Sequence, residues 1–187
     1  MSNVIFLDID GVLCINGKIY TQLLSNLEKI VNKTGASVVL SSNWRLYEYY
    51  RIYIIKLLKE YKINVIGYTE SINDERPIEI FRWILKNRPN MCIVIDDRSL
   101  DKEYFGSRIK DYFIKTDERV GLTIDCVSKA IFILTNYTIR YGINTIRLLY
   151  KSNRNHPTTY QLLHNKRRSF EINRKAFLTY IIKKKCL

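Results

Sequence analysis

Up to residue 137, short apolar runs alternate with longer segments in which apolar residues recur every three or four positions. The short runs are typical of strands buried in a parallel sheet, and the longer segments are typical of amphipathic helices. The predicted helices are residues 20–32, 46–61, 77–86 and 124–137, and the predicted strands are residues 4–7, 38–40, 64–67, 92–95 and 112–114. This alternation predicts an α/β fold with a doubly wound, Rossmann-like parallel sheet, in which ligands bind outside the carboxyl ends of the strands.

Beyond Tyr137 the alternation stops, and residues 138–151 and 159–185 are predicted to be helical or irregular. The charge changes at the same place. Residues 140–187 hold twelve Lys or Arg residues against one Glu, a net charge of +11, which leaves +2 of the total of +13 for residues 1–139. We therefore predict an α/β domain over residues 1–139 and a basic, α-helical extension over residues 140–187, suited to contact with a polyanion.

The surroundings of the protein are also constrained by its sequence. No apolar run approaches the roughly 20 residues needed to cross a bilayer, and the N-terminus lacks the regions of a secretion signal. We expect a cytoplasmic or otherwise intracellular protein that is not secreted and has no membrane partner. The cysteines form no CxxC pair and lie far in sequence from both histidines, so reduced thiols are expected rather than a zinc site.

Acidic residues stand at the ends of two predicted strands. Asp8 and Asp10 follow the strand at 4–7, and Asp96 and Asp97 follow the strand at 92–95. If these strands are neighbours in a parallel sheet, four carboxylates converge at one edge and repel one another unless a cation is bound. Mg2+ suits such a site because it is a hard ion that prefers oxygen ligands. The pattern therefore predicts a magnesium site formed by Asp8, Asp10, Asp96 and Asp97.

The segment Phe6-Leu7-Asp8-Ile9-Asp10-Gly11-Val12 resembles the first motif of the haloacid dehalogenase (HAD) superfamily, hhhDxDG followed by an apolar residue. The resemblance implies a Mg2+-dependent phosphatase, that is, a phosphoric monoester hydrolase. It implies that Asp8 is the nucleophile that forms an aspartyl-phosphate. Asp10 would be the general acid that protonates the leaving oxygen and the base that then activates water.

The other HAD motifs match in sequence order over about the first 125 residues. Ser42 matches the second-motif hydroxyl, because small HAD domains associated with RNA repair have Ser or Thr two residues before a Trp such as Trp44. Ser41 remains the alternative. Asn43 is expected to join Ser42 in binding phosphate. The acidic pair Asp96-Asp97 matches the fourth motif, and with Arg98 it resembles the phosphatase domain of phage polynucleotide kinase.

The third HAD motif is a Lys or Arg at the start of a helix, where it balances the charge of phosphate and nucleophile. Arg76, just before Pro77, matches it and is the third predicted phosphate-binding residue. The alternative is that Arg82 or Lys86 has this role while Arg76 pairs with a surface acid. Nearby, Trp44 and four tyrosines could stack on bases, but aromatic residues at helical spacing more often belong to a core, which is the preferred interpretation.

The spacing of the motifs leaves no room for a large cap domain, so the site is expected to be open to bulky substrates. A phosphate at the end of RNA or DNA is the favoured substrate, because the basic extension could hold a nucleic-acid backbone. The alternatives are a phosphoprotein phosphatase and a non-catalytic nucleic-acid-binding protein with a HAD-like fold. The predicted nucleic-acid-binding residues are Lys166, Arg167, Arg168, Lys183, Lys184 and Lys185.

Overall fold

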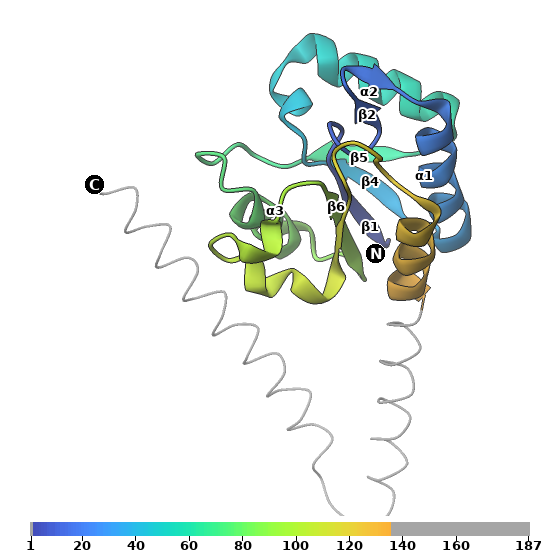
Figure 1. Ribbon diagram of the computed structural model, residues 1–187. Helices are drawn as coiled ribbons and strands as arrows, with labels where there is room; N and C mark the ends of the chain where they lie inside the picture. The colour runs from blue at the N-terminus through green and yellow to red at the C-terminus, as the bar shows by residue number, and fades with distance from the viewer. Residues whose placement is uncertain (1, 136–187) are drawn as a thin grey trace, which may run out of the picture. The chain divides into compact units, whose positions relative to one another are not determined.

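A five-stranded parallel sheet forms the centre of the protein in the computed structural model, which describes residues 2–135 (Figure 1). The strand order is β5-β4-β1-β6-β7. The strands are β1 (Val4–Leu7), β4 (Ser37–Leu40), β5 (Val65–Tyr68), β6 (Cys92–Asp96) and β7 (Phe113–Lys115). The prediction of a doubly wound α/β fold is confirmed. The predicted boundary at 139/140 and the helices predicted beyond it lie outside the described residues.

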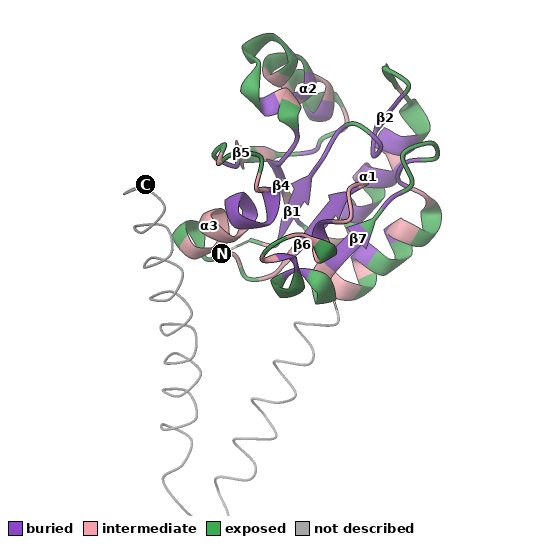
Figure 2. Ribbon diagram, turned by 60° about the vertical axis from the view of Figure 1, so that its left-hand side comes forward, coloured by how far each residue is buried: buried purple, intermediate pink, exposed green. Residues whose placement is uncertain are grey.

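Both faces of the sheet are covered, because successive residues of each strand point to opposite sides. On one face, Ile5, Leu7 and their neighbours pack against α1 (Thr21–Thr34), α2 (Glu48–Glu60) and the helical residues 124–135. On the other face, Phe6 and Val94 pack with α3 (Arg76–Asn87) and the short turns of 3-10 helix that precede β7. Figure 2 shows the buried sheet between exposed outer surfaces.

The helix boundaries follow from local chemistry. α1 buries Leu24, Leu27 and Ile30 at helical spacing, and it ends at Gly35, whose φ of 63° is the left-handed conformation that glycine adopts without strain. α3 begins at Arg76 with Pro77 in its first turn, where a missing backbone N–H costs nothing. Replacing fully buried Leu27 by Ala would cost about 2–5 kcal/mol of stability, because it would leave a cavity in this core.

Two details differ from the predicted elements. A hairpin of β2 (Cys14–Ile15) and β3 (Lys18–Ile19) follows the first motif. Its turn residues Asn16 and Gly17 both have positive φ, the geometry that an Asn-Gly turn favours. The helix predicted over 46–61 is α2, which begins only at Glu48. Leu46 ends a separate 3-10 helix, η1 (Asn43–Leu46), and the intervening Tyr47 is extended.

Among the described residues, no connection contains a large insertion that covers the carboxyl ends of the strands. Between the first and second motifs lie only the small hairpin, α1 and β4, and between the third and fourth lie α3 and its loop. The expectation that no large cap lies between the motifs holds for residues 2–135. In residues 2–135, every helix is too short or too polar to cross a bilayer.

Candidate active site

The central strands β1 and β6 bring the predicted motifs together. They pair in parallel with Leu7 opposite Ile95, so the next residues, Asp8 and Asp96, emerge side by side. The Asp8 amide donates a hydrogen bond to the Ile95 carbonyl at 3.0 Å. From β1 the chain proceeds to β4 and β5 on one side, then returns to β6 and β7 on the other. This reversal is the point at which doubly wound sheets bind ligands.

Three carboxylates meet at this point. Asp8, Asp96 and Asp97 each have a carboxylate oxygen within 4.8 Å of the others. Asp8 and Asp96 are buried, and Asp97 is half-buried. Burial raises the pKa of Asp8, against the opposing effects of Arg76 and a hydrogen bond with Ser42. Burial, helped by the charge of Asp8, raises the pKa of Asp96 to about 7. The cluster therefore favours a bound cation or a proton.

Gly11 makes room for one member of this cluster. Its φ is +66°, and a Cβ placed on it would lie 2.5 Å from Cγ and 2.6 Å from Oδ2 of Asp97. The Thr116 hydroxyl donates to the Gly11 carbonyl at 2.8 Å and holds the turn in place. The glycine of the first motif is thus needed both for its backbone conformation and for the position of a carboxylate from the fourth motif.

Arg76 lies against the carboxylates rather than at the surface. Its Nη1 is 3.1 Å from Asp8 Oδ2 and 2.7 Å from Asp96 Oδ2, and its side chain is buried. Burial alone would lower the pKa of Arg76, but the charges of Asp8 and Asp96 raise it above its usual value. The other cations considered lie elsewhere, since Arg82 pairs with Glu70 at 3.5 Å and Lys86 is exposed.

The turn after β4 supplies the polar side chains predicted from the second motif. The Ser42 hydroxyl hydrogen-bonds with the Asp8 carboxylate and accepts a 3.3 Å bond from the Trp44 amide. Asn43 Oδ1 accepts a 3.1 Å bond from Arg76 Nη2. The Ser41 hydroxyl, by contrast, is buried without a hydrogen-bond partner among residues 2–135. This geometry puts Ser42 and Asn43 at the cluster.

Asp10 is placed differently from the other three predicted metal ligands. Its side chain is exposed, and its Oδ2 accepts a 2.8 Å hydrogen bond from Trp44 Nε1. The group of three close carboxylates does not include it. The structure therefore brings together three of the four acids predicted to bind metal, while the carboxylate of Asp10 is hydrogen-bonded to an indole instead.

Sequence reasoning missed a buried ion pair under the site. Arg45 Nη2 lies 2.6 Å from Glu79 Oε2, and both side chains are almost completely buried. Arg45 also donates to the carbonyls of Ser42 and Thr69, at 2.7 and 2.9 Å. The pair thereby joins the Ser42 turn to the first turn of α3, which carries Arg76. In the sequence, these two charges differ in no way from solvated residues of a turn and a helix.

The four tyrosines near the second motif are not core residues, so the preferred interpretation was wrong for them. Tyr47, Tyr49, Tyr50 and Tyr53 are 63%, 77%, 47% and 45% exposed. Only Trp44 is partly buried against the core. The buried residues of α2 are Ile54 and Leu58. With these two residues facing the core, the tyrosines on the first two turns of the helix point toward solvent.

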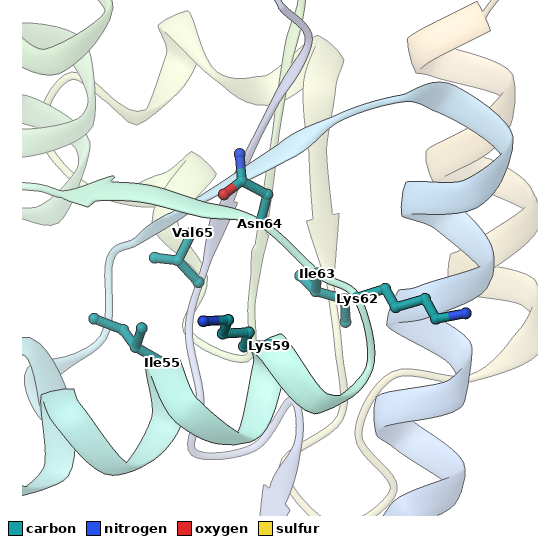
Figure 3. Close-up of a pocket in the computed structure, with 6 residues that line it drawn as sticks. All are labelled: Ile55, Lys59, Lys62, Ile63, Asn64 and Val65. Carbon is teal, nitrogen blue, oxygen red and sulfur yellow. The ribbon is translucent and has the colours of Figure 1, made fainter.

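An open depression of about 400 Å³ lies at the amino end of β5, opposite the carboxyl ends that carry the site (Figure 3). Ile55, Lys59 and Val65 are among its lining residues. It contains none of the predicted catalytic, phosphate-binding or metal-binding residues. The predicted nucleic-acid-binding residues Lys166, Arg167, Arg168, Lys183, Lys184 and Lys185 lie outside the described part of the chain.

Comparison with known proteins agrees with this geometry. The family described as "HAD domain in Swiss Army Knife RNA repair proteins" matches residues 4–127, which are 124 of the 187 residues. The chain is also 27% identical over 156 residues to a histidinol-phosphate aminotransferase of Clostridium novyi (strain NT). That alignment covers 67% of the chain and 42% of the relative, so the chain spans less than half of that protein's length. No solved structure matches the chain significantly.

Proposed function

Because the chain belongs to the family of HAD domains in Swiss Army Knife RNA repair proteins, a family of phosphatase-type hydrolases, we propose that it removes a terminal phosphate from RNA or DNA. The reaction proposed is Mg2+-dependent hydrolysis of a phosphomonoester through an aspartyl-phosphate. The observation that carries the proposal is the cluster of Asp8, Asp96 and Asp97 around one buried guanidinium, that of Arg76.

The donor set fits magnesium. Asp8, Asp96 and Asp97 offer only carboxylate oxygens, which are the ligands that this hard cation prefers. Burial raises the pKa values of Asp8 and Asp96, so the ionised carboxylates are unfavourable there unless a cation is bound beside them. Bound there, Mg2+ would neutralise charge on the carboxylates and on the phosphoryl oxygens of the substrate.

The residues of the chain then have distinct roles. A carboxylate oxygen of Asp8 attacks phosphorus, the bond from phosphorus to the leaving oxygen breaks, and Asp10 gives that oxygen a proton. Water next attacks the phosphorus of the aspartyl-phosphate while Asp10 takes up its proton, which releases inorganic phosphate and restores Asp8. Arg76 and the Ser42 hydroxyl stabilise the charge that develops on the phosphoryl oxygens.

Two features support a nucleic-acid end as the substrate. The site lies at the carboxyl ends of the central strands, where residues 2–135 form no large cap, so a phosphate on a long chain can approach it. The family name associates the domain with RNA repair, and the +11 charge of residues 140–187 would attract a polyanion.

The test is release of inorganic phosphate from a panel of substrates, with Mg2+ and with excess chelator. The panel holds 5′- and 3′-phosphorylated oligonucleotides, phosphopeptides, nucleotides and a small aryl phosphate. We expect the highest kcat/KM for an oligonucleotide and no turnover in chelator. Higher kcat/KM for phosphopeptides would favour the phosphoprotein alternative, and no release from any substrate would favour a non-catalytic binding protein.

The control is Asp8→Asn, which keeps the shape of the side chain but is a far poorer nucleophile. We expect this variant to lose turnover on every substrate of the panel while its circular dichroism spectrum stays that of the wild type. Phosphate release at the wild-type rate by this variant would exclude Asp8 as the nucleophile.

A further inference from the structure

A continuous group of aromatic rings extends from Asp10 over the start of α2. Trp44 donates its indole N–H to Asp10, and its ring lies 5.2 Å from that of Tyr50 and 6.4 Å from that of Tyr53. We call this group the aromatic surface; it consists of Trp44, Tyr47, Tyr49, Tyr50 and Tyr53. The aromatic surface therefore begins one hydrogen bond away from the proposed acid/base.

The rings hold one another in place. Tyr50 meets Tyr47 at 6.2 Å and Tyr49 at 5.6 Å, and both pairs are close to perpendicular, at 87° and 76°. Such edge contacts are favourable between aromatic rings and restrict their motion. Since Tyr47 and Tyr49 are the most exposed members, at 63% and 77%, the surface presents preordered rings to solvent.

Exposing these apolar rings to water is unfavourable for the folded protein, so a cluster of them on the surface calls for an explanation. Large apolar groups gathered on a surface mark sites that bind a partner more often than chance. The polar residues around the aromatic surface indicate what kind of partner it fits. Two exposed lysines, Lys56 and Lys59, follow Tyr53 by about one and two helical turns. The acidic residues of the same helix are Glu48 and Glu60. Arg51, also on α2, stacks over the Tyr68 ring at 5.2 Å.

We propose that the aromatic surface stacks the unpaired bases of a single-stranded nucleic acid whose terminal phosphate occupies the site at Asp8. The inference rests on the proposed function, and it adds that the strand is single and that its bases are bound. Rings are suited to this partner because every base has a face on which an aromatic side chain can stack, whatever the sequence. The lysines farther along α2 would then lie beside the backbone phosphates of the same strand and attract them by charge.

The experiment uses the double variant Tyr47→Leu/Tyr49→Leu, which alters the two most exposed rings and no residue of the proposed catalytic site. Stacking free energies in such proteins predict that KM for a phosphorylated single strand rises about tenfold to a hundredfold. We expect unchanged kcat, unchanged hydrolysis of a small aryl phosphate, and an unchanged KM for a phosphorylated oligomer of abasic sugars. Tyr47→Phe/Tyr49→Phe keeps the rings and should behave as the wild type.

The matched control is Phe132→Leu, which removes a ring as exposed as that of Tyr47 from the helical residues 124–135. It should leave every KM unchanged. The proposal is overturned if the double Leu variant keeps the wild-type KM for the single strand, or if its KM rises equally for the abasic oligomer. It is also overturned if affinity for a phosphopeptide falls as much as affinity for the strand.

Binding separates this inference from the proposed function. Asp8→Asn protein, with and without the two Leu substitutions, is titrated with a fluorescent unphosphorylated single strand and followed by anisotropy. Weaker binding by the Leu variant supports base stacking even if no substrate is hydrolysed. Equal binding overturns it even if oligonucleotides prove to be good substrates.

Discussion

Gly11 and Asp97 approach so closely that a Cβ on the glycine would lie 2.5 Å from the carboxylate carbon of the aspartate. Gly11→Ala must therefore displace Asp97, which is one of three proposed metal ligands. Disturbing the orientation of a ligand commonly lowers metal affinity about tenfold to a hundredfold. We expect the Mg2+ concentration for half-maximal phosphate release to rise by such a factor, with activity partly recovered at high Mg2+.

Gly17→Ala is the control for this prediction. Gly17 also has a positive φ, +74°, but an added Cβ would meet nothing within 4 Å. Both variants share the backbone strain of a left-handed alanine, of about 1–2 kcal/mol, and only Gly11→Ala disturbs a carboxylate. Equal Mg2+ dependence in the two variants would show that the Gly11 contact does not position Asp97.

A second prediction concerns the Arg45–Glu79 ion pair. Burial lowers the pKa of Arg45 and the Glu79 charge opposes that effect, so the pair depends on both members. Glu79→Gln leaves the Arg45 charge buried without its partner, which should cost about 3–5 kcal/mol of unfolding free energy in urea titrations. Glu70→Gln breaks the exposed pair with Arg82 and should cost less than about 1 kcal/mol. Similar losses in both variants would contradict the special role of the buried pair.

A third prediction uses the raised pKa of Asp96, which is about 7 in the metal-free protein, against about 3.9 in an unfolded chain. The folded state then holds a proton that the unfolded chain releases. Its stabilising effect is complete below about pH 4 and is lost as the pH rises through about 7. In chelator, we expect the Tm of the wild type to fall from pH 5 to pH 8 more than that of Asp96→Asn.

The comparison with Asp96→Asn removes the contributions of titrating groups that do not interact with Asp96. Asp8, whose pKa burial also raises, acts in the same direction and remains in both proteins. Saturating Mg2+ should raise the Tm more at pH 8 than at pH 5, since the cation binds the ionised carboxylates. A difference in Tm between wild type and variant that stays constant from pH 5 to pH 8 would rule out the assigned titration.

Which features could be predicted from the sequence depended on how local their causes are. Asp8 and Asp96 each end a short apolar run, and the ends of parallel strands share one edge, so their convergence followed once the strands were recognised. The hairpin after Asp10 was missed although Asn16-Gly17 is a strong turn signal, because its strands have only two residues each.

Long-range partners lay beyond such reasoning. Nothing near Arg45 in the sequence identifies Glu79, 34 positions later, as its partner. Helical periodicity grouped Tyr50 and Tyr53 with Ile54 and Leu58, but it cannot tell how much of a face the rest of the fold covers. Ile54 and Leu58 suffice to anchor α2, and the tyrosines remain in solvent.

The last prediction concerns the basic extension and separates chemistry from capture of the substrate. The predicted catalytic, phosphate-binding and metal-binding residues all precede residue 100, so neutralising six basic residues of the extension should leave hydrolysis of a small aryl phosphate unchanged. Binding of a long oligonucleotide should weaken. Each lost phosphate contact should also reduce the slope of log affinity against log salt by about 0.7–0.9. The six residues are Lys166, Arg167, Arg168, Lys183, Lys184 and Lys185.

A control must change the net charge equally without touching the extension, because overall charge alone attracts a polyanion. Exposed lysines of the α/β domain serve for this, namely Lys18, Lys29, Lys33, Lys86, Lys102 and Lys110. If the extension is the capture surface, its variant loses more affinity and more salt dependence than this control, measured by anisotropy at several salt concentrations. Equal losses would mean that the strand responds only to total charge. Unchanged affinity and slope in the extension variant would remove those six residues from the binding surface and move the phosphoprotein alternative ahead.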